Sequence, residues 1–307
     1  MEQIIQICGG GYAANINLSR GANCISLTHE THRAAILREP DYEKELDNPY
    51  LYGMPLLFPA NRISGGRFYF EGREYRFPVN EPATGCHLHG IMHTLPFSLA
   101  EQSADSVRCV WDAPHPDIPF RFRMEILYHL SGEGLTQSTR ITNLSSYTIP
   151  ILLAYHTTFR LPFLTGSKPE NVRIFAEVSE EIIRSPENYL PTGEVLPKSE
   201  TAITLCAGTF SPIQQKISKH YRTANQGQIE LRDIAHGLKV VYRNSANYPW
   251  RLFYNMGTDK FICLEPMTNL VDGPNFPLGA DEQGFDCLAP NDTKEYISQI
   301  SLQEVAL

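Results

Sequence analysis

Two ionisable residues stand at the ends of hydrophobic runs in this chain. His156 follows Leu153-Ala154-Tyr155, and Glu265 closes the run Phe261-Ile262-Cys263-Leu264 just before a proline. A partly buried imidazole suits a proton donor, and a carboxylate at the end of an apolar strand needs a partner or a chemical role. The reference pKa is about 4.3 for a glutamate and about 6.5 for a histidine, so the two groups would need only modest pKa shifts for acid/base work near neutrality. Glu265 could instead form a structural salt bridge with an arginine.

Arg62 is a candidate ligand-binding residue. It ends the stretch Gly53-Met54-Pro55-Leu56-Leu57-Phe58-Pro59-Ala60-Asn61-Arg62-Ile63. After this apolar run, the five planar donors of its guanidinium could hold the hydroxyl groups of a ligand. A structural hydrogen-bond network at a strand end is the alternative.

Three histidines lie close together between residues 87 and 93. His87 and His89 are two residues apart, so a strand would place both on one face where they could share a site, and His93 follows. Paired histidines can bind metal, but no glutamate follows until Glu101, so we expect no metal site and no cofactor. Structural, hydrogen-bonded histidines are the alternative.

The elements that must position these side chains have a two-residue period. Every even position from Phe120 to Leu130 is apolar, which a half-buried strand requires. Residues 68–77 predict a hairpin with its turn at Glu71-Gly72. Further strand-like runs are Ile149 to Tyr155, Gly237 to Arg243, Trp250 to Tyr254 and Phe261 to Leu264.

Helical periodicity is nearly absent, and the 22 prolines limit long helices. We therefore expect an all-β fold, one large antiparallel β-sandwich, in a single domain over residues 1–307. Residues 167–199, rich in Glu and Pro, predict a long excursion at the edge or rim of a sheet.

Composition excludes several classes of partner. The net charge of -8 gives no overall positive field for nucleic acid or anionic lipid, and no apolar run of about 18 residues predicts a membrane span. The N-terminus lacks a signal peptide, and the seven cysteines are scattered, so we expect a cytoplasmic protein with reduced thiols. Nucleophile-elbow, phosphate-loop and dinucleotide-binding motifs are missing from the sequence.

Taken together, the motifs resemble those of the aldose 1-epimerase (galactose mutarotase-like) family, in the family's order and over nearly the whole chain. Residues 53–63 resemble its signature, which reads G-x-P-x-x-x-P-x-N-R-I in this sequence, and residues 68–77 resemble the F-x-F-x-G-x-x-Y hairpin that follows. Leu88-His89-Gly90 and His156-Thr157-Thr158-Phe159 are similar to its two histidine motifs. Leu264-Glu265-Pro266 resembles its glutamate motif.

The resemblance implies an extended β-sandwich of the galactose mutarotase-like supersandwich type, with the site in a concave face. It implies that Glu265 is the general base and His156 the general acid, while Arg62, His89 and Asn61 bind the sugar. The expected activity is interconversion of the α and β anomers of a free aldose such as glucose or galactose. The expected partner is thus a monosaccharide, without nucleic acid or membrane, and the expected assembly is a monomer or homodimer.

Two positions depart from the family pattern. Ile91 stands where a second glycine usually follows Leu-His-Gly, and Lys219 stands near the position of a sugar-binding aspartate. Because of this lysine, a carbohydrate-binding protein without catalytic activity is an alternative function on the same fold. An epimerase of a modified or phosphorylated hexose would need a cluster of Arg or Lys for the anionic group. A glycoside hydrolase would need a second carboxylate beside Glu265, and the sequence shows no convincing one.

Overall fold

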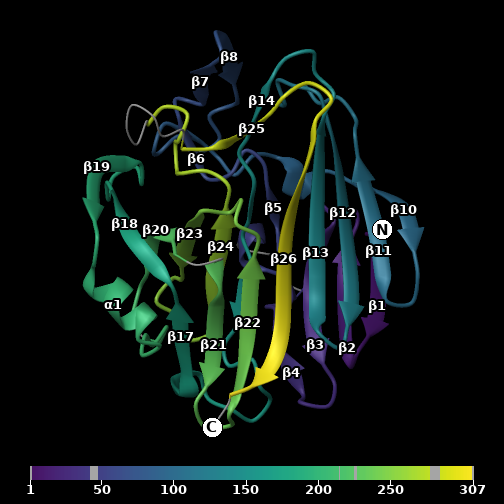
Figure 1. Ribbon diagram of the computed structural model, residues 1–307, viewed down its shortest axis with the longest axis vertical. Coiled ribbons are helices and arrows are strands. Elements are labelled where there is room, and N and C mark those ends of the chain that lie inside the picture. Colours follow the sequence, from purple (N-terminus) through teal and green to yellow (C-terminus); the bar gives the residue numbers. More distant parts are fainter. Residues whose placement is uncertain (1, 42–47, 214, 225–226, 277–283, 306–307) are drawn as a thin grey trace.

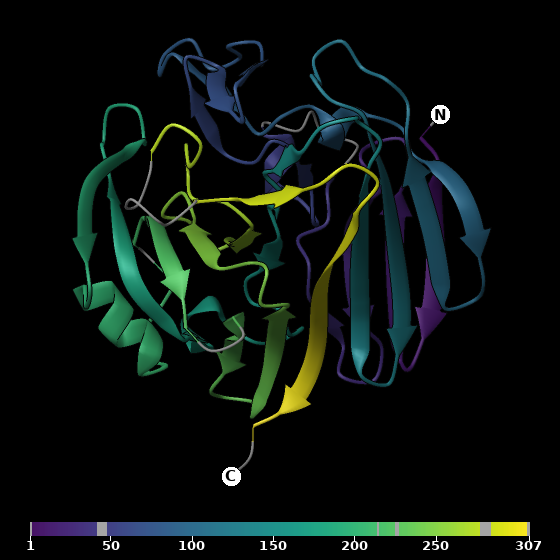
Figure 2. The same cartoon turned by 45° about the horizontal axis from the view of Figure 1, so that its top comes forward.

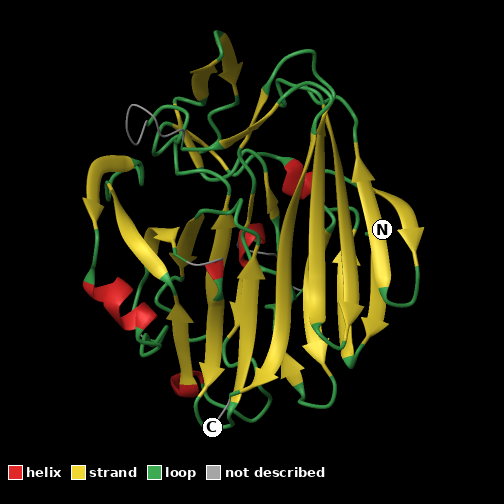
Figure 3. Ribbon diagram, viewed as in Figure 1, coloured by secondary structure: helices red, strands yellow, loops and turns green. Residues whose placement is uncertain are grey.

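The computed structural model describes residues 2–41, 48–213, 215–224, 227–276 and 284–305. Strands dominate this part of the chain (Figure 3). Its helices are short, one α-helix and three 3-10 turns: α1 (Glu200–Cys206), η1 (Pro49–Leu51), η2 (Met92–Thr94) and η3 (Pro169–Asn171). The all-β class predicted from the two-residue periodicity is confirmed. In the described ranges no helix is long and apolar enough to cross a membrane.

Sheet I has eight antiparallel strands and forms the front of the molecule (Figure 1). Its strands in spatial order are β10 (Ser98–Gln102), β11 (Ser106–Trp111), β12 (Phe122–Ser131), β13 (Gly134–Asn143), β26 (Thr293–Glu304), β22 (Leu238–Asn244), β21 (Ile229–Asp233) and β17 (Val172–Ala176). The C-terminal strand β26 lies between β13 and β22 and thereby joins two distant parts of the chain (Figure 2).

Sheet II also has eight strands. In spatial order they are β19 (Pro191–Leu196), β18 (Val178–Arg184), β20 (Ser218–Thr223), β23 (Trp250–Tyr254), β24 (Phe261–Met267), β15 (Ala154–Tyr155) and β5 (Leu56–Leu57), while β16 (Thr158–Arg160) pairs with β24 beside β15.

The remaining strands form smaller sheets. Sheet III, behind the long strands of sheet I, contains β1 (Ile4–Gly9), β2 (Tyr12–Asn17), β3 (Asn23–His29) and β4 (Ala34–Ala35) (Figure 1). Three strand pairs complete the fold: β6 (Arg62–Ser64) with β9 (Cys86–Leu88), β7 (Arg67–Phe70) with β8 (Arg73–Arg76), and β14 (Ile149–Ile151) with β25 (Asp286–Leu288).

The main core lies between sheet I on one side and sheets II and III on the other. In β12 the even residues from Phe122 to Leu130 are buried, as their periodicity predicts, and they belong to the same apolar cluster as Ile262 and Leu264 of β24. Alternation along β24 therefore turns Cys263, Glu265 and Met267 to the opposite face of sheet II. That outer face is where the polar site is built.

Several strand predictions are confirmed, and two need correction. The hairpin turn at Glu71-Gly72 has both residues at positive φ, 47° and 73°, as a tight hairpin requires. The run from Ile149 to Tyr155 is not one strand but two, β14 and β15, because the chain changes pairing partners after Ile151. Residues 167–199 lie at sheet edges as expected, but they are more regular than a long excursion, since they supply β17 and β19, the edge strands of sheets I and II, together with β18.

Candidate active site

The register of sheet II places His156 opposite Glu265. Ala154 pairs with Met267 on one side and Thr158 pairs with Cys263 on the other, and both pairs belong to one continuous antiparallel register. His156 and Glu265 fall midway between them, at a position without mutual backbone hydrogen bonds, where facing side chains come closest. The Nε2 atom of His156 lies 3.3 Å from Oε1 of Glu265.

Pro266 explains why the strand facing β24 is interrupted here. The N–H of Leu264 donates to the carbonyl of Thr157 at 2.9 Å, and the same pattern would next require a donor at residue 266. Proline has no N–H, so this ladder bond is missing and the facing strand is divided into β15 and β16. His156 lies in the gap, with its own N–H bonded to Pro55 O at 3.0 Å.

Asn61 and His89 face each other at the end of the β6–β9 pair. Arg62 pairs with Leu88, and one step further the His89 N–H donates to the Asn61 carbonyl at 3.0 Å. Both residues have left-handed backbones, with φ of 57° at Asn61 and 63° at His89, which is unusual for residues other than glycine. Such conformations concentrate at functional sites.

The left-handed backbone also separates the two histidines that the sequence placed on one face. Because β9 ends at Leu88, alternation stops before His89. His87 packs on Phe77 and places its Nδ1 2.7 Å from the Pro78 carbonyl, whereas His89 reaches the cavity described below. The expectation that these imidazoles share a site is therefore wrong. The described residues contain no group of three or more His, Cys, Asp or Glu suited to a metal ion.

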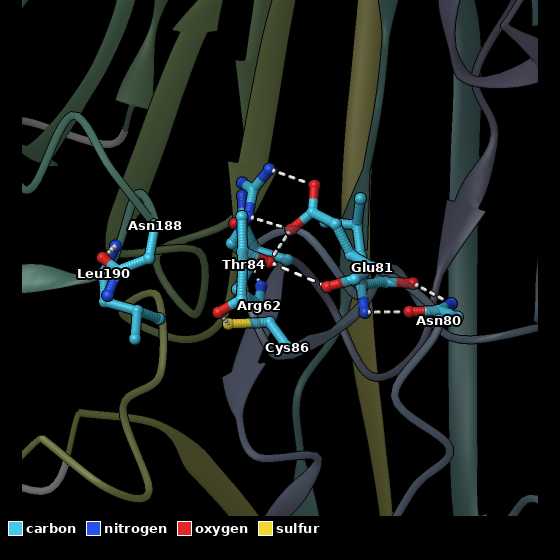
Figure 4. Close-up of polar contacts among 9 residues, drawn as sticks. Arg62, Asn80, Glu81, Thr84, Cys86, Asn188 and Leu190 are labelled. Atoms are coloured by element: carbon cyan, nitrogen blue, oxygen red, sulfur yellow. Dashed lines mark hydrogen bonds and ion pairs between the residues drawn. The ribbon is translucent and has the colours of Figure 1, made fainter.

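Arg62 is held in one orientation by a half-buried network (Figure 4). Its Nε and Nη2 donate to the two carboxylate oxygens of Glu81, each at 2.7 Å. Thr84 donates a further hydrogen bond to Glu81, and the ring of Tyr189 lies 4.6 Å from the guanidinium carbon. The structural network considered for Arg62 thus exists, and it orients a side chain that also lines the cavity.

These residues surround a cavity of about 340 Å³. All five site residues expected from the sequence resemblance line it: Asn61, Arg62, His89, His156 and Glu265. Ten further residues complete the lining: Asn48, Tyr50, Glu81, Leu88, Arg184, Tyr189, Lys216, Ser218, Leu252 and Tyr254. The volume is at the small end of the range for ligand sites, which suits a compact ligand.

Sequence reasoning missed these ten residues, because half lie in loops or the η1 turn and half lie in strands whose side chains the sequence does not assign to the cavity face. Tyr50, in η1, packs against His89 and His156 with ring centroids 4.6 and 6.1 Å apart. Tyr189 lies in a turn that an Asn188 side chain closes by accepting a hydrogen bond from Leu190 N (Figure 4). An aromatic residue in each loop was the available signal, but it did not indicate which loops meet.

Lys219 does not take part in the cavity. Alternation along β20 turns Ser218 toward the site, opposite Tyr254, and turns Lys219 to the other face. There its Nζ forms an ion pair with Glu181 at 2.6 Å. Lys219, one of the two residues that depart from the family pattern, is thus structural, and its ion pair has no direct role in the site.

Burial reverses the expected ionisation of the central pair. Desolvation raises the pKa of Glu265 to about 8, although the positive charges of Arg184 and Arg62 oppose the rise. Desolvation also lowers the pKa of His156 to about 4. The modest tuning expected from reference values is therefore wrong. Between these pKa values the pair holds one proton, which either member can carry.

Unpartnered atoms show where a polar ligand would bind. Glu265 Oε2, His156 Nδ1 and His89 Nδ1 are buried and have no hydrogen-bond partner in the protein. Buried polar atoms normally have partners, so three such atoms on residues that line one cavity indicate a site for a polar ligand or for water.

The fold and the site thus define a β-sandwich protein with a buried contact between an imidazole and a carboxyl group beside a small polar cavity. The chain belongs to the aldose 1-epimerase family, whose model matches residues 3–301. Its fold is that of a galactose mutarotase-like protein from Clostridium acetobutylicum, with a TM-score of 0.93, 26% identity, and coverage of 99% of this chain and 98% of that one.

Relatives found by sequence are similar to the chain at about the same level of identity. The uncharacterized protein YphB of Escherichia coli K12 is 27% identical over 256 residues, which are 81% of this chain and 82% of YphB. The galactose mutarotase of Rattus norvegicus is 28% identical over 150 residues, 48% of this chain and 42% of that protein.

Proposed function

We propose that this protein is a mutarotase that interconverts the α and β anomers of a free aldose. The contact between His156 and Glu265 carries the proposal. Mutarotation removes a proton from the anomeric hydroxyl and delivers one to the ring oxygen, and both oxygens are bonded to the same carbon. An acid and a base must therefore lie side by side, as these residues do at 3.3 Å.

In the proposed reaction the carboxylate of Glu265 accepts the proton of the anomeric hydroxyl while protonated His156 donates to the ring oxygen. The bond between C1 and the ring oxygen breaks, and the open-chain aldehyde forms. Rotation about the C1–C2 bond presents the other face of the aldehyde, and the two residues reverse their roles as the ring closes. Each group can contribute roughly 10² to 10⁴ in rate. Protons are only exchanged, so the reaction needs no cofactor.

The single proton on the pair supports this reaction. The reactive form, with Glu265 ionised and His156 protonated, has the same number of protons as the neutral pair that burial favours. The positive charges of Arg62 and Arg184 favour the ionised carboxylate. We propose that Arg62, His89 and Asn61 hold the sugar hydroxyls and thereby orient C1 over the pair.

The names of the relatives support the substrate class. Galactose mutarotases of Rattus norvegicus and Sus scrofa are among the matched proteins, so glucose and galactose are the first aldoses to test. Freshly dissolved single anomers, followed by polarimetry with and without enzyme, test the function. Faster equilibration than the spontaneous rate supports it, whereas sugar binding without acceleration would show the non-catalytic alternative.

A further inference from the structure

The cavity is rich in positive charge, although the whole chain carries a net charge of -8. Three cationic side chains line it, Arg62, Arg184 and Lys216, against two acidic ones, Glu81 and Glu265. Glu81 neutralises Arg62 through two hydrogen bonds, and burial keeps Glu265 largely protonated at neutral pH, with a pKa of about 8. Among the described residues, neither Arg184 nor Lys216 forms an ion pair with an acidic side chain that lines the cavity.

Arg184 is placed to present unused donors to a ligand. Its Nη2 donates to the carbonyl and the hydroxyl oxygen of Ser218, at 2.8 and 2.9 Å. Within the described part of the chain, no carboxylate lies within ion-pair distance of its guanidinium. A guanidinium has five N–H donors, so most of those of Arg184 remain available. Burial lowers the pKa of Arg184 only to about 10, which leaves it charged at neutral pH.

Arg184 and Glu265 reach the cavity from different strands, and the charge of Arg184 acts on the Glu265 carboxyl. The contacts of Arg184 with Ser218 place the guanidinium over β20, while Glu265 projects from β24. Strand β23 lies between them, so the two strands are on the order of 10 Å apart at 4.7–4.9 Å per strand. A pyranose with C1 at Glu265 would therefore direct its far end toward Arg184. Lys216 lies two residues before Ser218 and is exposed at the same side of the cavity.

We propose that the substrate is an aldose that carries an anionic group, a carboxylate or a phosphate, at the end remote from C1, and that Arg184 and Lys216 bind this group. The inference rests on the proposed mutarotase function and specifies its substrate class. The sequence alone does not favour such a substrate, because Arg184 and Lys216 come from separate segments and meet only in the fold. The parallel N–H donors of an arginine can bind two oxygens of a carboxylate or of a phosphate.

Anomer exchange of neutral and anionic sugars tests the proposal. The panel is D-glucose and D-galactose, their uronates, and their 6-phosphates, each corrected for its spontaneous rate. We expect kcat/KM for a uronate or a 6-phosphate to exceed that of the neutral parent at least about tenfold, with KM rising as salt is added. A preference for uronates would identify the carboxylate, and a preference for 6-phosphates the phosphate.

Variants assign the effect to the two cations. Arg184→Gln and Lys216→Gln should each lower the ratio of anionic to neutral kcat/KM, Arg184→Gln by about tenfold, because a charge-assisted hydrogen bond is lost. Lys260→Gln is the matched control, since Lys260 is exposed and does not line the cavity, and it should keep the wild-type ratio.

A wild-type enzyme that accelerates neutral aldoses as well as both kinds of anionic sugar would overturn the inference and leave the proposed function intact. No acceleration with any sugar of the panel would instead refute the function. If Arg184→Gln does not fold, the wild-type ratio and the Lys216→Gln variant still decide.

Discussion

Replacing Glu265 by glutamine should make the protein more stable at alkaline pH. Burial raises the pKa of this carboxyl from 4.5 to about 8 in the folded state. Between these two values the folded chain keeps a proton that the unfolded chain has released, so stability falls as the pH rises. Glutamine has nearly the same shape and does not titrate.

The two pKa values set the size of the effect. The carboxyl has a pKa of 4.5 in the unfolded chain and of about 8 in the fold. Relative to acid pH, where it is protonated in both states, its ionisation therefore lowers the unfolding free energy of the wild type by about 1 kcal/mol at pH 5 and by about 5 kcal/mol at pH 9. The difference in unfolding free energy between Glu265→Gln and the wild type should therefore shift by about 4 kcal/mol in favour of the variant between these pH values. His156 titrates on the acid side, with its folded pKa of about 4, and is present in both proteins.

Urea denaturation at pH 5, 7 and 9 measures this difference directly. Glu187→Gln is the control, because Glu187 is exposed and its replacement should leave the pH dependence unchanged. Parallel pH profiles for Glu265→Gln and the wild type would refute the reasoning, since they would mean that Glu265 ionises as readily in the fold as in the unfolded chain.

Three further predictions concern activity and folding. The rate of anomer exchange should be nearly constant between about pH 4 and about pH 8, because the pair holds one proton over that range; a bell confined to pH 4.5–6.5 would contradict the shifted pKa values. Arg62→Lys should raise KM about tenfold or more with a smaller effect on kcat, because lysine lacks the planar fork that Glu81 orients; an unchanged KM would exclude sugar binding by Arg62. Gly90→Ala should cost at least about 2 kcal/mol of stability, because φ is 64° and a Cβ would lie 2.0 Å from the Phe58 carbonyl oxygen. Its control, Gly72→Ala, has a similar φ of 73° but nothing within 4 Å, so equal losses of stability in urea would rule out a steric cause.

The sequence predicts those strands in which buried and exposed side chains alternate regularly along the chain. Strand β12 is identified by its buried even positions, and the β7–β8 hairpin by a turn that tolerates positive φ. The same rule fails for Ile149 to Tyr155, because an apolar run does not show where the chain changes from one partner strand to another. It also fails for His89, whose left-handed backbone ends the alternation.

The site is predictable only in part for the same reason. His156 and Glu265 stand out because each follows a hydrophobic run of the sequence, although β24 continues past Glu265 to Met267, and the family motifs indicate Arg62, His89 and Asn61. Arg184 and Lys216 belong to segments with no common pattern, and the face on which Lys219 lies depends on the register of β20. The protonation states of His156 and Glu265 are the property that the sequence predicts least well, because their pKa shifts arise from burial that only the folded chain creates.

The most direct test of the account is anomer exchange at equilibrium, followed by magnetisation transfer between the two anomeric protons of one sugar. The wild type should accelerate exchange, and Glu265→Gln and His156→Asn should each reduce kcat by about 10² or more while the sugar still binds. A Glu265→Gln variant that exchanges anomers at the wild-type rate would contradict the central role given to the His156–Glu265 pair.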